Sequence, residues 1–156
     1  MREYILKLQL VDSDIWRELS VSGETTFYNL HKIIQIAFGW NDKHLHRFMV
    51  DGLEIGDYED EDKMPINFKY EKDADLHTIF KDKMQVLYEY DYGDGWEIEI
   101  KVLKRKIIEK QVKPCILACN GGMAKDDCGG VEGLKQLAEI PVNIEELNIV
   151  LAHTYE

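Results

Sequence analysis

Apolar and polar residues alternate along several segments of the chain, as they do in strands that bury one face. The alternation runs over residues 4–11 and resumes over residues 15–21. Other segments of the same kind are residues 45–50, 66–70 and 85–103. The last of these predicts a β-hairpin, because an Asp/Gly-rich turn interrupts its two alternating halves.

A different spacing, with apolar residues three and four positions apart, predicts one amphipathic helix over residues 25–38. Thr25 or Thr26 can cap its first turn, and Gly39 can end it in a left-handed conformation. A helical turn over 74–80, two C-terminal helices over 131–139 and 143–153, and loops over 57–63 and 114–130 complete the pattern. Together these elements predict a single α+β domain over residues 1–156, with a mixed, largely antiparallel sheet and the 25–38 helix packed on it.

Composition is consistent with this interpretation. A chain of 156 residues with 45% hydrophobic content can bury a substantial core. Its longest apolar run, residues 115–119, is far too short to cross a bilayer, so no membrane is expected as a partner. The chain starts on a strand-like alternation without a signal-peptide pattern, and it contains three cysteines. These features predict a reducing, cytoplasmic setting.

The net charge of −11 argues against a general nucleic-acid-binding function, because the acidic excess repels phosphates. One basic run, residues 101–106, is an exception. At a strand end, such a run is more typical of a solvated face or of edge-strand protection than of a nucleic-acid patch.

The turn of the predicted hairpin is the strongest candidate for a functional site. Asp91 and Asp94 lie beside Tyr92 and Trp96, which is more acidity than a turn requires. The structural alternative is turn chemistry, in which an Asp side chain caps backbone N–H groups and neighbouring glycines supply positive φ.

Two other segments carry candidate ligands. His44 and His46 would point to one face of a strand, where they could share a divalent metal ion, although no third ligand is identified and local hydrogen bonding is the favoured explanation. Asp126 and Asp127 precede a Gly-Gly turn, where they could bind a cation or serve as a helix N-cap. The spacing of Cys115, Cys119 and Cys128 matches no zinc motif and favours buried or incidental thiols.

Four ordered motifs resemble the plasmid pRiA4b ORF-3-like family, some members of which are labelled as passenger proteins of insertion elements. They are Ile15-Trp16-Arg17, Leu30-His31 with the Gly39–Phe48 run, Tyr88–Glu97, and Asp126-Asp127-x-Gly129-Gly130-x-x-Gly133. The resemblance covers nearly the whole chain and implies a single compact α+β domain of unknown function. Family members commonly have a His at the position of Ile98 and a Cys-Pro-Pro-Glu-Asp run at residues 123–127, and this chain has neither.

Two functions are therefore compared. In the first, the domain is a recognition module whose pocket, lined by Trp40, Tyr92 and Trp96, binds a protein, a peptide or a small cationic ligand. The carboxylates edging that pocket are Asp91, Asp94, Asp126 and Asp127. In the second, the domain is a metal-dependent hydrolase-like enzyme with His44 and His46 as ligands and Asp91, Asp94 or Asp127 as ligand or base. The missing family His and Cys favour the recognition module.

Overall fold

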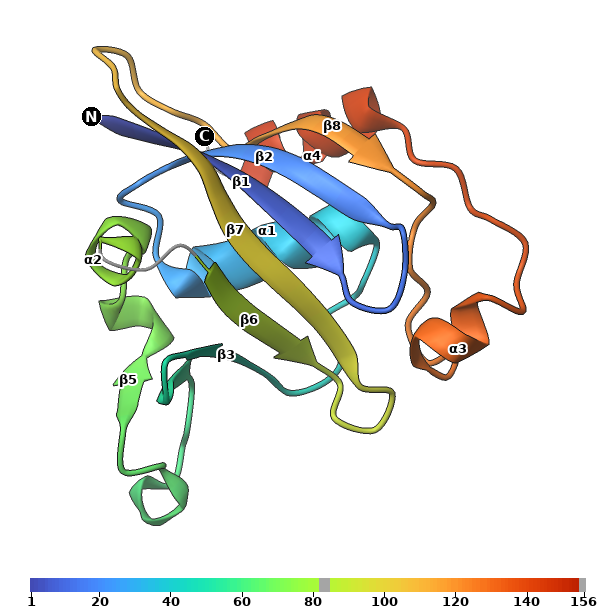
Figure 1. Cartoon of the computed structure of the whole chain (residues 1–156), viewed down its shortest axis with the longest axis horizontal. Helices are drawn as coiled ribbons and strands as arrows, with labels where there is room; N and C mark the ends of the chain where they lie inside the picture. The colour runs from blue at the N-terminus through green and yellow to red at the C-terminus, as the bar shows by residue number, and fades with distance from the viewer. Residues whose placement is uncertain (82–84, 155–156) are drawn as a thin grey trace.

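A mixed sheet of eight strands forms the centre of the protein in the computed structural model, which describes residues 1–81 and 85–154 (Figure 1). The strand order is β5-β4-β3-β6-β7-β1-β2-β8, and all neighbours are antiparallel except the parallel pair β4 and β5. The strands are β1 (Arg2–Leu10), β2 (Trp16–Ser22), β3 (His46–Val50), β4 (Leu53–Gly56), β5 (Phe68–Tyr70), β6 (Gln85–Tyr90), β7 (Trp96–Ile107) and β8 (Cys115–Asn120). The predicted α+β fold with a largely antiparallel sheet is confirmed.

The predicted amphipathic helix is α1 (Phe27–Phe38). The hydroxyl oxygen of Thr26 accepts a hydrogen bond from the Asn29 N–H, and Gly39 ends the helix at a φ of 88°. Both ends therefore follow the capping signals in the sequence. The remaining helices are α2 (Leu76–Phe80), α3 (Gly130–Leu134) and α4 (Ile144–Thr154), with 3₁₀ turns η1 (Glu61–Lys63) and η2 (Glu71–Asp73).

The core lies between α1 and one face of the sheet (Figure 1). Alternate residues of β1, namely Tyr4, Leu6, Leu8 and Leu10, are fully buried, whereas Lys7 and Gln9 on the opposite face are partly exposed. The inward positions of β7 are occupied by Trp96, Ile98, Ile100 and Val102. The period-two pattern in the sequence thus identified the buried face correctly.

The predicted secondary structure is wrong in three places: two strands were missed and one helix was predicted too long. β4 was not predicted, and residues 115–120, expected to be loop, form β8 as the neighbour of β2. Both segments are short, and they become strands because an existing strand offers its free backbone edge. In addition, α3 ends at Leu134, well before residue 139, so the segment that follows is not helical.

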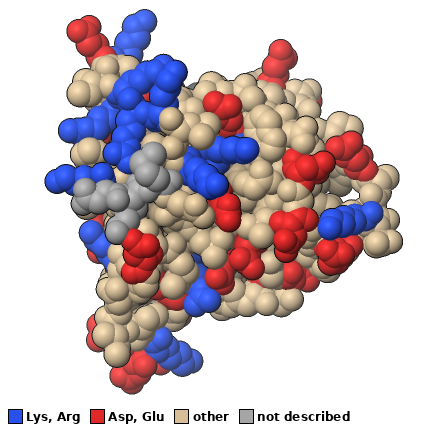
Figure 2. Space-filling model, in the orientation of Figure 1, with Lys and Arg blue, Asp and Glu red and all other residues tan. Residues whose placement is uncertain are grey.

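Charged side chains are distributed unevenly over the surface. Lys and Arg gather over the end of the sheet where β1 begins and β7 ends, and Asp and Glu are spread over the rest of that face (Figure 2). At this end of β7, Lys104 to Lys106 pair with β1, and within residues 1–81 and 85–154 no second strand pairs with them. Among the described residues, no helix is long and apolar enough to span a membrane, and the three cysteines are free and partly buried.

Candidate functional site

Three segments that are distant in the sequence meet at one edge of the sheet. They are the loop between α1 and β3, the β6–β7 turn, and the segment between β8 and α3. His44 Nε2 lies 2.7 Å from Asp127 Oδ1 and 3.4 Å from Asp91 Oδ2. The predicted hairpin tip, histidine segment and Asp-Asp segment are therefore brought together.

Asp91 serves the turn and the cluster with different oxygens. It adopts a φ of 57°, and its Oδ1 accepts hydrogen bonds from the backbone N–H groups of Gly93 and Asp94. Its Oδ2 faces His44. The Asp91 side chain is nearly buried, at 10% exposure. Turn chemistry thus explains one oxygen of this carboxylate and leaves the other directed at the imidazole.

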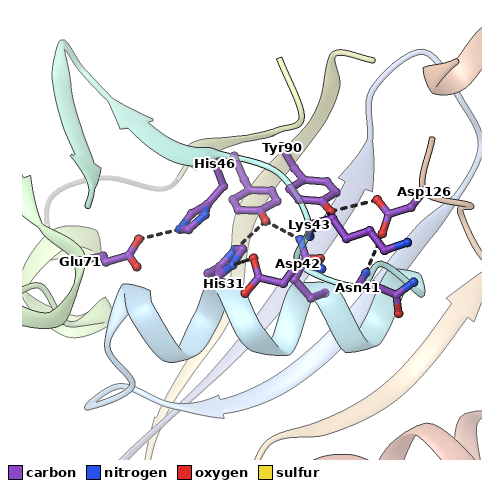
Figure 3. A network of polar contacts seen from close by, with 10 residues as sticks. His31, Asn41, Asp42, Lys43, His46, Glu71, Tyr90 and Asp126 are labelled. Atoms are coloured by element: carbon purple, nitrogen blue, oxygen red, sulfur yellow. Dashed lines mark hydrogen bonds and ion pairs between the residues drawn. The ribbon is translucent and has the colours of Figure 1, made fainter. Parts of the chain in front are cut away.

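Asp126 and Tyr90 support the loop that carries His44 (Figure 3). Asp126 Oδ1 accepts a 2.9 Å hydrogen bond from the Tyr90 hydroxyl, and its Oδ2 accepts one of 2.7 Å from the Asn41 N–H. The Tyr90 oxygen in turn accepts from the Lys43 N–H. Burial and the Asp126 hydrogen bond raise the pKa of Tyr90, so the hydroxyl stays protonated and keeps donating. Both Asp126 oxygens are therefore engaged in holding the loop.

Asp94 contacts the turn that precedes α3. Its Oδ2 accepts a 3.0 Å hydrogen bond from the Gly129 N–H. The backbones approach so closely that a Cβ on Gly130 would lie 2.3 Å from the Asp94 carbonyl oxygen. Gly130 is therefore required by this contact, and Asp94 acts here as a docking group between the hairpin and the Gly-Gly turn.

Trp40 and Trp96 lie in the core, which corrects their predicted place in a ligand pocket. Trp40 is 4% exposed and Trp96 is 0% exposed. Their ring centroids are 5.3 Å apart, and Trp40 also stacks on Phe38. Trp96 is the first inward-facing residue of β7, so the strand period that predicts the hairpin also directs this indole into the core.

His44 and His46 belong to two different clusters, so the prediction that both hold one metal is not supported by their positions. β3 begins at His46, and His44 lies in the preceding loop, where the two-residue period of a strand does not apply. His46 Nε2 lies 2.7 Å from Glu71 Oε1, and its ring stacks on His31 with centroids 3.4 Å apart. The two histidines that share a contact are therefore His31 and His46.

His31 and Glu71 are buried polar residues that the sequence analysis did not assign to the site. His31 and Gln35 are one helical turn apart on the apolar stripe of α1. Two polar residues on an apolar stripe indicate a buried polar network, so this part of the site was predictable from the sequence. Glu71 lies on η2 and is 3% exposed, and no local pattern in the sequence indicates its burial.

The hydrogen bonds of Gln35 determine which ring nitrogen of neutral His31 carries the proton. Gln35 Oε1 accepts from the Asp42 N–H, so its Nε2 must be the donor to the Tyr88 hydroxyl. The one Tyr88 proton can then be donated to His31 Nδ1, which leaves Nε2–H to donate to Asp42 Oδ1 over 2.7 Å. Burial, with a further contribution from His46, lowers the pKa of His31 to about 4.

The lowered pKa of His31 predicts a loss of stability in mild acid. The unfolded chain takes up a proton near pH 6.5 and the folded protein only near pH 4, so stability from this residue is complete above pH 6.5 and is lost as the pH falls toward 4. The expected loss is on the order of 3 kcal/mol, measured by urea unfolding at several pH values. In His31→Gln, this part of the pH dependence should be absent; equal slopes in both proteins would contradict the assignment.

A pocket of about 660 Å³ opens beside both histidine clusters. Of the predicted site residues, the described ones that line it are Tyr92, His44 and His46. The rest of its wall comes mainly from the acidic loop after β4, which the sequence predicted as a loop over residues 57–63 without assigning it to a site. The lining residues are Asp42, His44, Leu45, His46, Asp57, Tyr58, Glu59, Asp60, Lys63 and Tyr92.

Comparisons with known proteins find relatives over most of the chain. A family model described as plasmid pRiA4b ORF-3-like protein matches residues 2–148. The uncharacterized protein y4hQ of Sinorhizobium fredii is 27% identical over 135 residues, which cover 85% of this chain and 68% of that protein. The crystal structure of MM3350 from Methanosarcina mazei, titled a protein of unknown function, superposes with a TM-score of 0.76 at 32% identity. This match covers 86% of the present chain and 78% of MM3350.

Proposed function

The chain belongs to the plasmid pRiA4b ORF-3-like family, and we propose that this domain is a recognition module that binds a cationic ligand in its acidic pocket. The observation that carries the proposal is the composition of the pocket wall. Four carboxylates line it, from Asp42, Asp57, Glu59 and Asp60, against one lysine, Lys63. Such a wall attracts amines and guanidinium groups and repels phosphates and carboxylates.

Two tyrosines add an aromatic component to the pocket. Tyr92 is half exposed, and the guanidinium of Arg47 lies 5.4 Å from its ring centroid. This ring therefore already takes part in a cation–π contact within the protein. The hydrogen bond of Tyr58 with Glu54, together with burial, raises the pKa of Tyr58 to about 12. Its ring is thus neutral at physiological pH and compatible with a cationic neighbour.

The proposal predicts selective binding of positively charged peptides. A short oligolysine peptide should shift the NMR amide signals of the 57–60 loop and of Tyr92, whereas an oligoglutamate peptide of equal length should not. Binding should weaken in about 1 M salt, where the screening length falls to about 3 Å. Shifts confined to other surfaces, or equal binding of both peptides, would contradict the proposal.

Charge-removing variants locate the binding surface. The triple variant Asp57→Asn/Glu59→Gln/Asp60→Asn should lose about tenfold or more in affinity for oligolysine, because three of the attracting carboxylates are gone. The matched control, Glu24→Gln/Glu132→Gln/Glu145→Gln, removes the same charge from exposed positions outside the pocket. It should stay within about twofold of the parent protein if local rather than net charge governs binding.

A further inference from the structure

We infer that His44, Asp91 and Asp127 form a binding site for one divalent transition-metal ion, at the point where the β6–β7 turn meets the segment before α3. One donor atom from each residue lies within 4.8 Å of the other two. His44 also lines the acidic pocket. This site is additional to the recognition function and does not depend on it.

The distances between the donor atoms suit an ion held among them. Ligands at about 2.1 Å from a metal lie about 3.0–3.4 Å from one another in octahedral or tetrahedral geometry. His44 Nε2 is 3.4 Å from Asp91 Oδ2 and 2.7 Å from Asp127 Oδ1. A small outward movement of Asp127, which is half exposed, would therefore complete the geometry.

Two of the three ligands, Asp91 and His44, lie on supported segments before an ion binds. The backbone N–H groups of the β6–β7 turn hold Asp91 through Oδ1, and within residues 1–81 and 85–154 no hydrogen bond reaches its Oδ2. This oxygen belongs to a side chain that is nine-tenths buried, and it faces His44. The charge of this carboxylate is thus directed at the position between Asp91 and His44 where an ion would bind. The neighbouring Tyr90–Asp126 contact fixes the loop of His44.

The other histidine cluster does not suit a single ion. An imidazole nitrogen binds a metal in the plane of its ring. The rings of His31 and His46 are within 7° of parallel with centroids 3.4 Å apart, so their in-plane lone pairs lie in separate layers. An ion about 2.1 Å from one nitrogen in its plane would lie far outside the plane of the other. His46 Nε2 is also engaged with Glu71. The His44 cluster contains one imidazole only and avoids this conflict.

The donor set indicates the class of metal. One imidazole nitrogen and two carboxylate oxygens suit Zn²⁺, Co²⁺, Mn²⁺ or Fe²⁺, whereas Mg²⁺ and Ca²⁺ prefer ligand sets made entirely of oxygen. Three protein ligands leave coordination positions open. Because the His44 and Asp127 side chains are 30% and 55% exposed, those positions are accessible to water or to a ligand.

The test is titration of chelator-treated full-length protein with Co²⁺, followed by calorimetry and by visible absorption. We expect one ion per chain, without a thiolate-to-cobalt charge-transfer band. His44→Gln and Asp127→Asn should each weaken binding about tenfold or more. Asparagine suits position 127 because it tolerates the left-handed backbone there, at a φ of 60°. Glu97→Gln, which removes one charge from an exposed position of the same hairpin outside the ligand set, should change the affinity less than about twofold.

Three results would overturn the site: no binding of Co²⁺, binding that both ligand variants leave unchanged, or a charge-transfer band that reports cysteine ligation. Circular dichroism of the variants verifies that each is folded. The pocket is tested separately by titrating oligolysine into the same protein in the presence of chelator. If the protein binds oligolysine but not Co²⁺, the metal site alone is refuted. If it binds Co²⁺ but not oligolysine, the pocket alone is refuted.

Discussion

Arg17→Met is expected to lower the free energy of unfolding by roughly 3–5 kcal/mol. Arg17 is completely buried, and no carboxylate of the described residues forms an ion pair with it. Its guanidinium donates instead to four backbone carbonyl oxygens and lies over the ring of Phe38. The four acceptors belong to Trp16, Ala37, Asn120 and Gly122. Methionine fills the same space but leaves these carbonyls without a donor.

The loss should be measured by urea unfolding and by the melting temperature, which should fall by about 10 °C. Arg17→Lys keeps the charge but cannot reach four acceptors, so it should be destabilised as well. Arg2→Met, at an exposed position, is the control and should change stability by less than about 0.5 kcal/mol. If Arg17→Met lowers the free energy of unfolding by less than about 1 kcal/mol, the prediction is wrong, because water then satisfies the four carbonyl oxygens in place of the guanidinium.

This arginine also bears on the candidate site. Two of its acceptors, Asn120 and Gly122, lie at the end of β8 and directly after it. The chain that leaves this point reaches Asp126 and Asp127 within a few residues. Arg17 therefore anchors the segment that carries two of the site carboxylates, and its motif in the sequence has a structural explanation.

Trp96→Ala is expected to cost roughly 3–5 kcal/mol of stability, because the indole is completely buried and contacts Trp40. Trp96→Phe should cost considerably less. The Trp96 Nε1 has no hydrogen-bond partner among the described residues, so phenylalanine removes volume but no polar contact. Urea unfolding of both variants provides the measurement.

Tyr92→Ala is the matched comparison from the same hairpin. Tyr92 is 50% exposed and lines the acidic pocket, so its removal should change stability by less than about 1 kcal/mol and should weaken oligolysine binding. The reverse pattern, with Trp96→Ala stable and Tyr92→Ala strongly destabilised, would contradict the assignment of one residue to the core and the other to the pocket.

Elements with strong local signals were predictable from the sequence. Helix α1 has an apolar stripe and capping residues at both ends, and β1 alternates over its whole length. The short strands β4 and β8 lack such signals, because their formation depends on pairing with other strands. Strand β4 pairs with β3 and β5, and β8 pairs with β2. The predicted end of α3 was wrong because an apolar run alone does not maintain a helix.

The candidate site shows the same division. Local patterns selected the β6–β7 turn, the histidine segment and the Asp-Asp segment as candidate parts of a site. The pairing of His44 with Asp91 and Asp127, the stacking of His46 on His31, and the burial of Trp40 and Trp96 depend on contacts between residues far apart in the chain. Whether two residues share a face depends on whether both lie within the strand, and therefore on where the strand begins. Their burial depends on what packs above that face. Neither is encoded in the few neighbouring residues from which a local prediction is made.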